Sequence, residues 1–275
     1  MYAKFYFERF WEGDQKNHLF VCMPFHDSFD SRFRDIIEPS AKQAGFDEAI
    51  RIKGDISSDV IISKIWDGIA NSMMILIDLT DDPKYPESPH VNGNVLYEAG
   101  AAHAMREPSS IVMIRDQSPE SADFDIKGLT INQPPSSQLS QPWLIKIFPD
   151  ARENHKWQES KRVNAAAESI DDIGLGLMLR HGKRPAGWNH FNTMSQNELE
   201  KISVLRLIDL GVLRFATGGV HRPAEYAYHW TKFGYEVMRN LGIQRMSEEE
   251  FRGSPDFPAA VAARQQYVES IKKSP

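Results

Sequence analysis

Short apolar runs alternate with segments of helical periodicity over the first half of this chain. Runs of this length are typical of strands that are covered on both faces in a parallel sheet, and each amphipathic segment follows one of them. Strands are expected at 18–25, 46–52, 73–77, 110–115 and 127–132. Helices are expected at 28–44, which Pro39 should kink, and at 56–70 and 95–105. This alternation predicts an α/β fold with a five-stranded sheet.

A different pattern follows the Pro- and Ser-containing segment 133–141. A long helix is expected within 150–180, and a second helix at 195–210 carries apolar residues on one side, namely Leu199, Ile202, Leu205 and Ile208. Strands at 212–215 and 225–230 then predict a hairpin, and Thr231 caps a last helix that Gly242 closes. Helix, hairpin and helix in this order resemble a winged-helix module over residues 186–242. The expected organisation is an α/β domain at 1–149, a helical linker at 150–185 and a smaller α+β, winged-helix-like domain with a tail at 186–275.

Composition places the chain among ordinary globular proteins. Of its 275 residues, 41% are hydrophobic and 25% are charged. No apolar run approaches the roughly 20 residues needed to cross a bilayer, and the first residues lack the apolar centre of a signal peptide, so we expect a cytoplasmic location and no membrane partner. The single cysteine, Cys22, lies inside an apolar run and is expected to be a core residue.

The net charge of -6 is unevenly distributed. Residues 1–150 hold 14 Lys and Arg against 23 Asp and Glu, whereas residues 151–275 hold 18 against 15. The acidic first half argues against a nucleic-acid groove there, while the mildly basic second half permits one.

Acidic residues mark the carboxyl end of the third predicted strand. Asp78 closes that strand, and Glu98 falls in the first turn of the next helix, for which Asn94 is the expected N-cap. Ligands of open parallel sheets bind at the carboxyl ends of the strands, so we expect Asp78 and Glu98 to line one crevice. The positive end of the helix dipole favours an ionised Glu98, which suits a nucleophile or a charge stabiliser. Helix capping alone also explains an acidic residue there.

Other polar and aromatic residues are expected at the same edge. Phe25 could stack on a base or cap the core, and Asp55 could bind a sugar hydroxyl or cap a helix. Asn92 and Asn94 flank Gly93 in a pattern that suits a tight turn, and their amides could contact a ligand. The histidines show no metal-ligand spacing, and no phosphate-binding glycine motif is present, so neither a metal nor a cofactor is expected.

Five collinear segments carry a resemblance to a known family. They are VCMPF at 21–25, GDISSDVIISKIWDGI at 54–69, ILIDLT at 75–80, NGNVLYEAGAAHA at 92–104 and FDIKGL at 124–129. Together they resemble the nucleoside 2-deoxyribosyltransferase-like family, which is related in fold to TIR domains. The resemblance covers residues 18–132. With the right-handed crossover rule, it implies a flavodoxin-like, doubly wound parallel sheet in the order 2-1-3-4-5.

The resemblance also implies an activity, which is cleavage or transfer at the N-glycosidic bond of a nucleoside, a nucleotide or NAD. Glu98 would attack the anomeric carbon or stabilise its positive charge, Asp78 would orient the glutamate or a sugar hydroxyl, and Tyr97 could fix the carboxylate by a hydrogen bond. Water would give hydrolysis, and a second base would give transfer. A pocket completed by a neighbouring subunit, and hence a homo-oligomer, is what the family implies.

The extra C-terminal module departs from the short single-domain transferases. It fits better the nucleotide- or NAD-cleaving relatives that act in bacterial defence systems. Two alternatives stay open: a non-catalytic nucleotide sensor that uses the same crevice, and a DNA-associated regulator that uses residues 186–242. Acidic residues are interspersed among the basic ones of that module, which favours a protein-interaction or oligomerising role over DNA reading.

Overall fold

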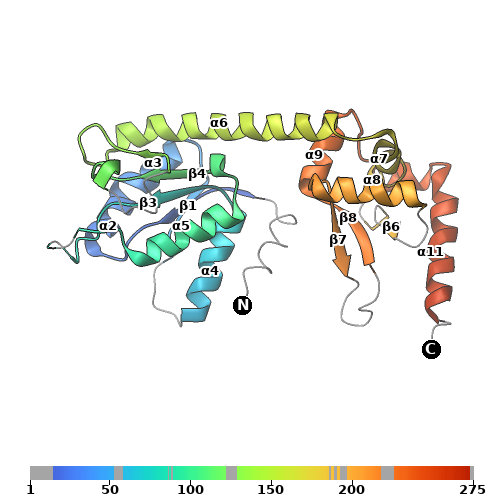
Figure 1. The fold of residues 1–275 in the computed structure, drawn as a ribbon, viewed down its shortest axis with the longest axis horizontal. Coiled ribbons are helices and arrows are strands. Elements are labelled where there is room, and N and C mark those ends of the chain that lie inside the picture. Colours follow the sequence, from blue (N-terminus) through green and yellow to red (C-terminus); the bar gives the residue numbers. More distant parts are fainter. Residues whose placement is uncertain are drawn as a thin grey trace. The chain divides into compact units, whose positions relative to one another are not determined.

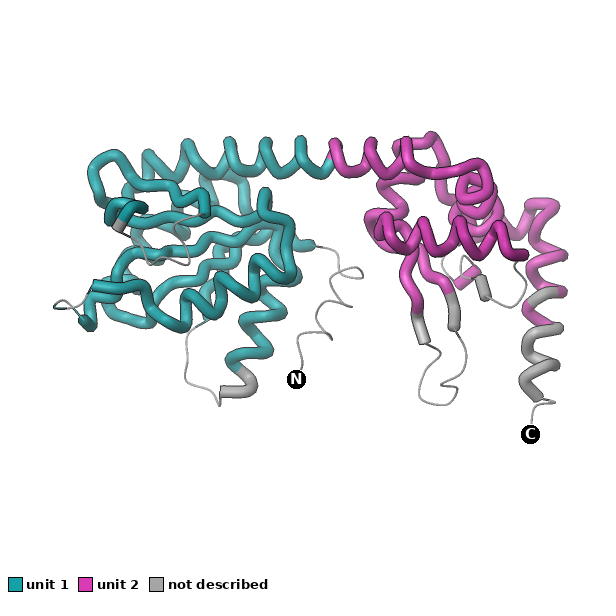
Figure 2. The backbone as a smooth tube through the Cα atoms, viewed as in Figure 1, with its two compact units in different colours: residues 1–159 teal, residues 160–275 magenta. Residues whose placement is uncertain are grey.

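The computed structural model describes residues 15–52, 58–85, 87, 89–121, 129–185, 187–188, 191–192, 197–217 and 226–272. The chain divides into two compact units, residues 1–159 and residues 160–275 (Figure 2). The aromatic-rich start of the chain and the predicted substrate contact Asp55 lie outside the described residues.

The first unit contains a five-stranded sheet in which every neighbouring pair is parallel. The strands are β1 (Lys16–Cys22), β2 (Glu48–Ile50), β3 (Ser72–Asp78), β4 (Ile111–Ile114) and β5 (Ile131–Asn132). Their spatial order, β2-β1-β3-β4-β5, confirms the predicted order. Strand β3 lies at the centre and is almost fully buried, as its continuous apolar run requires.

Helices cover both faces of this sheet (Figure 1). On one face, α4 (Ser58–Asn71) and α5 (Gly93–Met105) share an apolar core with alternate strand residues, among them Cys22, Ile75 and Ile77. On the other face lie α2 (Asp27–Arg32), the π-helix η1 (Phe33–Ile37), α3 (Glu38–Gln43) and the start of α6 (Gln141–Glu168). Successive strand residues point to opposite faces, so each strand contributes to both cores.

Pro39 explains the π-helical segment between α2 and α3. Its ring nitrogen carries no hydrogen, so the carbonyl of Asp35 has no helical donor four residues later. The side-chain amide of Gln141 donates to this carbonyl instead, at 2.6 Å. The predicted helix at 28–44 therefore changes its hydrogen-bond pattern directly before Pro39, where a kink was expected. Two short 3-10 helices, η2 (Pro108–Ser110) and η3 (Pro119–Ser121), precede and follow β4.

Helix α6 begins nine residues earlier than the predicted long helix at 150–180 and ends at Glu168. It includes Pro149. Leu144 and Phe148 are fully buried against the sheet and hold this part of the helix in place. The boundary between the two units consequently lies within α6, at residues 159 and 160.

The second unit combines helices with a three-stranded antiparallel sheet in the order β6-β8-β7. Its elements are α7 (Asp172–Leu177), the π-helix η5 (Met178–Gly182), β6 (Phe191–Asn192), α8 (Glu198–Asp209), β7 (Leu213–Thr217), β8 (Tyr226–Trp230), α9 (Lys232–Asn240), α10 (Glu248–Arg252) and α11 (Asp256–Lys272). Thr231 caps α9, as predicted, by accepting a hydrogen bond from the backbone of Gly234 at 2.8 Å. Among the described helices, none is long and apolar enough to cross a membrane.

Of the apolar side predicted for the helix at 195–210, only Ile208 packs against the described core of the second unit. Helix α8 buries Ser203, Val204 and Leu207, whereas Leu199, Ile202 and Leu205 are exposed. The hydroxyl of Ser203 donates to the carboxylate of Asp171 at 2.8 Å, which fixes this rotation of the helix. The core of the second unit is therefore built from the other side of α8.

Candidate functional site

Glu98 lies in the second turn of α5, not in the first. The N-cap of the helix is Asn92, whose side-chain oxygen accepts a hydrogen bond from the backbone of Asn94 at 2.9 Å. The helix consequently begins at Gly93, and the prediction that Asn94 caps it is wrong. Residues of a second turn are beyond the strongest influence of the helix dipole, which falls off within the first turn.

The carboxyl group of Glu98 is buried at the carboxyl ends of β1 and β2. Only 6% of the residue is exposed. The thiol of Cys22, the last residue of β1, forms a hydrogen bond with the carboxylate, and the guanidinium of Arg51 lies near it. Burial raises the pKa of Glu98 to about 7, although the Cys22 hydrogen bond and the Arg51 charge both lower it. Burial is thus the largest influence on the pKa of Glu98, which changes its protonation near neutral pH.

Cys22 is a core residue, as predicted. It is buried in the same apolar cluster as Ile77, and burial raises the pKa of its thiol, with the neighbouring Glu98 charge acting in the same direction. A protonated thiol is a poor nucleophile. Cys22 therefore serves this site as a hydrogen-bond donor.

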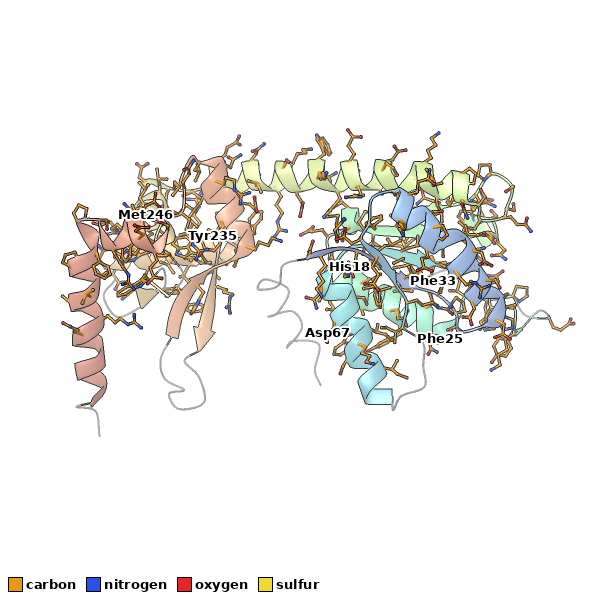
Figure 3. All side chains as sticks on the ribbon, turned by 180° about the vertical axis from the view of Figure 1, so that it is seen from behind. His18, Phe25, Phe33, Asp67, Tyr235 and Met246 are labelled. Carbon is orange, nitrogen blue, oxygen red and sulfur yellow. The ribbon has the colours of Figure 1, made fainter. Side chains whose placement is uncertain are left out.

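Arg51, directly after β2, connects the carboxyl end of β2 to the segment that follows β1. It donates to the carboxylate of Asp30 and to the carbonyl of Pro24, both at 2.6 Å. Its guanidinium lies 5.6 Å from the ring centre of Phe25. Its side chain is only 5% exposed, and its Nε has no hydrogen-bond partner among the described residues. Phe25 itself is 46% exposed, so this ring lies at the surface of the first unit (Figure 3) and does not cap the core.

Asp78 does not share a crevice with Glu98, contrary to the prediction. It is fully buried and accepts hydrogen bonds from Arg32 Nε at 2.6 Å and from the backbone of Thr80 at 3.1 Å. Burial raises the pKa of Asp78, while Arg32 and Thr80 lower it. The same guanidinium binds both oxygens of Asp116, at 2.6 and 3.0 Å.

The alternation of side chains along β3 separates the two carboxyl groups. Ile77 and Leu79 belong to the core beneath α4 and α5, on the side of Glu98. Leu76 belongs to the opposite core, and Asp78 has the same parity as Leu76. Its partner Arg32 comes from α2, which covers that second face. Asp78 is thus held in an ion pair that joins α2, β3 and the end of β4.

The remaining predicted contacts lie at the start of α5. Asn92 donates to the carboxylate of Asp82 at 2.6 Å while it caps the helix, so both ends of its amide are used within the fold. The side chain of Asn94 is exposed. Tyr97 is 53% exposed, and the structure places no hydrogen bond between it and Glu98. Among the described residues, no group of three or more His, Cys, Asp or Glu side chains could hold a metal ion.

Sequence reasoning missed three residues that organise this edge, namely Cys22 as a hydrogen-bond donor, Arg51 and Arg32. One signal was present for Arg51, because it lies near the carboxyl end of the strand predicted at 46–52. A basic residue at such an end is a candidate partner for an acidic residue on a neighbouring element.

No protein-family model and no curated protein matches the sequence.

Proposed function

We propose that this protein cleaves the N-glycosidic bond of a nucleoside, a nucleotide or NAD, with Glu98 as the carboxylate that acts on the anomeric carbon. The proposal rests on the family resemblance of residues 18–132 and on one observation. Of the three buried acidic residues described, Asp78 has an arginine partner and Asp82 has an amide donor and a backbone donor. For Glu98, the Cys22 thiol is the one hydrogen-bond donor found among the described residues, and Arg51 acts on it only through its charge.

A buried carboxyl group without strong hydrogen bonds is costly, and such groups concentrate at functional sites. Its place supports the same conclusion, because ligands of parallel sheets bind at the carboxyl ends of the strands. Arg51, directly after β2, lies near this carboxyl group, and its guanidinium is 5.6 Å from the ring centre of Phe25. The exposed ring of Phe25 offers a stacking face for a base.

In the reaction, the bond between the anomeric carbon and the base nitrogen breaks, and its electron pair leaves with the base. The carbon becomes oxocarbenium-like, and the ionised Glu98 stabilises this positive charge or forms a bond to the carbon. Water then adds its oxygen to the carbon, any bond between Glu98 and that carbon breaks, and the proton that water loses balances the one taken up by the departed base, which gives hydrolysis. A second base in place of water gives transfer.

We also propose that the second unit contains a winged-helix-like module. The order of its elements, α8, the β7–β8 hairpin and α9, supports this proposal. We propose that it makes protein contacts. Helix α8 exposes apolar side chains, and these cannot hydrogen-bond to base edges as a DNA-reading helix must. A chain that combines such a module with a nucleotide-cleaving domain fits an effector of a bacterial defence system.

A panel of NAD, deoxynucleosides and nucleotides, incubated with the purified chain and separated by chromatography, tests the activity. We expect release of free base or nicotinamide, and we expect Glu98→Gln to lower the rate by about 100-fold or more. Glu120→Gln is the matched control, because Glu120 is exposed in the same unit. Turnover that survives Glu98→Gln unchanged refutes the proposal. Binding of a ligand without any product indicates the nucleotide sensor instead.

The pH dependence tests the form of Glu98 that acts. With a pKa of about 7, the ionised fraction rises about tenfold per pH unit below that value and then levels off. We therefore expect kcat/KM for the best substrate of the panel to rise from pH 5.5 to 7 and to be flat from 7.5 to 8.5. A rate that falls through pH 7 assigns Glu98 to proton donation and contradicts its role as the ionised, charge-stabilising carboxylate.

A further inference from the structure

Helix α8 presents an apolar stripe on its outer face. Leu199, Ile202 and Leu205 are 62%, 63% and 55% exposed. Val204 and Leu207, on the inner face, are 0% and 1% exposed. A spacing of three residues keeps the exposed three in one stripe along a helix. Burial of large apolar side chains stabilises a protein, so a stripe of this kind marks an interaction surface.

Charges at the two ends of the stripe are opposite in sign. Glu198 directly precedes Leu199, and Arg206 directly follows Leu205. Both side chains are exposed, at 86% and 54%. Leu199 and Leu205 each lie three residues from Ile202, towards the two ends of the helix. Glu198 and Arg206 each lie four residues from Ile202, so the charge is negative at one end of the stripe and positive at the other. If a second copy of the helix is placed antiparallel to the first, leucine therefore faces leucine, and each charge faces a charge of opposite sign.

We propose that this stripe binds the same stripe of a second copy of the chain, with the two α8 helices antiparallel and the two-fold axis at Ile202. In this arrangement Leu199 faces Leu205 of the second copy, and Glu198 is level with Arg206 of the second copy. An interface on a two-fold axis must be complementary to itself, and this pattern meets that condition. A parallel pairing would put like charges level with each other, which is unfavourable.

The existing partners of these two charges do not prevent the pairing. Glu198 contacts Lys201 at 2.7 Å, and Arg206 lies 3.9 Å from Asp171. Exposed ion pairs of this kind contribute little to stability, so both side chains can turn to a second copy at little cost. The interface lies wholly on the second unit and does not depend on the proposed activity of Glu98.

Light scattering after size exclusion of the full chain, at concentrations from about 1 to 100 µM, tests the proposal. We expect a mass of twice 31.4 kDa that falls to 31.4 kDa on dilution. Ile202→Glu places two like charges together at the axis, and we expect it to weaken the dimer by roughly 100-fold or more. Leu179→Glu is the matched control, since Leu179 is a 46% exposed apolar residue of the same unit outside α8. The dimer affinity of Leu179→Glu should equal that of the unmodified chain. Circular dichroism confirms that each variant is folded.

A charge exchange tests the antiparallel register. Glu198→Arg and Arg206→Glu should each weaken the dimer, by about tenfold, because each one puts like charges level with each other. The double variant restores opposite charges and should recover the affinity of the unmodified chain. A chain that stays monomeric at all concentrations overturns the proposal. A dimer affinity that Ile202→Glu leaves unchanged, or a double variant that does not recover the affinity of the unmodified chain, overturns it equally.

Discussion

Replacing Glu98 by glutamine should stabilise the folded protein at alkaline pH while it lowers the activity. Burial raises the pKa of this carboxyl group from 4.5 to about 7. One pKa unit corresponds to about 1.4 kcal/mol, so the charged carboxylate costs the folded state about 3 kcal/mol. Glutamine has nearly the same shape and can accept the hydrogen bond of the Cys22 thiol, but it carries no charge.

The direction of the pH effect follows from the raised pKa. Because the folded state holds this proton more tightly than the unfolded state does, the stabilisation is complete below pH 4.5 and is lost as the pH rises through about 7. At pH 5 the unmodified chain and Glu98→Gln should therefore have similar stability. At pH 8.5 the variant should be more stable by about 3 kcal/mol, which corresponds to a Tm higher by roughly 6 to 12 °C for a unit of this size.

Scanning calorimetry of both proteins between pH 5 and 8.5 measures this difference. Titrations elsewhere in the chain affect both proteins alike and cancel in the comparison. Glu120→Gln, at an exposed position, should show a Tm difference that does not change with pH. A Tm difference for Glu98→Gln that stays constant over the pH range, or a variant that is the less stable protein at pH 8.5, would refute the predicted cost of the buried charge.

Two further comparisons test how the first unit is held together. Arg32→Met leaves both aspartates that Arg32 binds without their cation, and it should lower the free energy of unfolding by about 3 to 5 kcal/mol in urea titrations. Arg34→Met, which removes only an exposed pair, should leave it unchanged; equal effects of the two variants contradict a stabilising role of the buried pair. Gly68→Ala puts a methyl group 2.1 Å from the ring of Phe20 and should lower the Tm, whereas Gly100→Ala meets no atom within 4 Å and should raise it. A tolerated Gly68→Ala would show that Phe20 can move aside.

The sheet was predictable because its signals are local. Continuous apolar runs identify buried parallel strands, and the crossover rule with the family resemblance gives the order β2-β1-β3-β4-β5. The position of Glu98 near the strand ends follows from the same topology. Its neighbours do not, because Cys22 and Arg51 come from elements far apart in the sequence.

Three features needed the folded chain. The face on which Asp78 lies depends on its parity relative to a core that the sequence does not assign. The protonation of Glu98 depends on how deeply it is buried, which is the largest influence on its pKa. Helix α8 has apolar residues on two sides, so periodicity alone could not decide that Val204 and Leu207 pack inward while Ile202 faces out.

Helix α6 belongs to both units, since Phe148 packs in the core of the first and Ala166 in the core of the second. The boundary between the units therefore falls inside a helix and not in a loop. A fragment that stops at 149 would lose Arg152, which donates to the carbonyl of Ala44 at 2.6 Å, and would expose a new helix end with unsatisfied carbonyl groups. Each half should be produced with the whole helix attached.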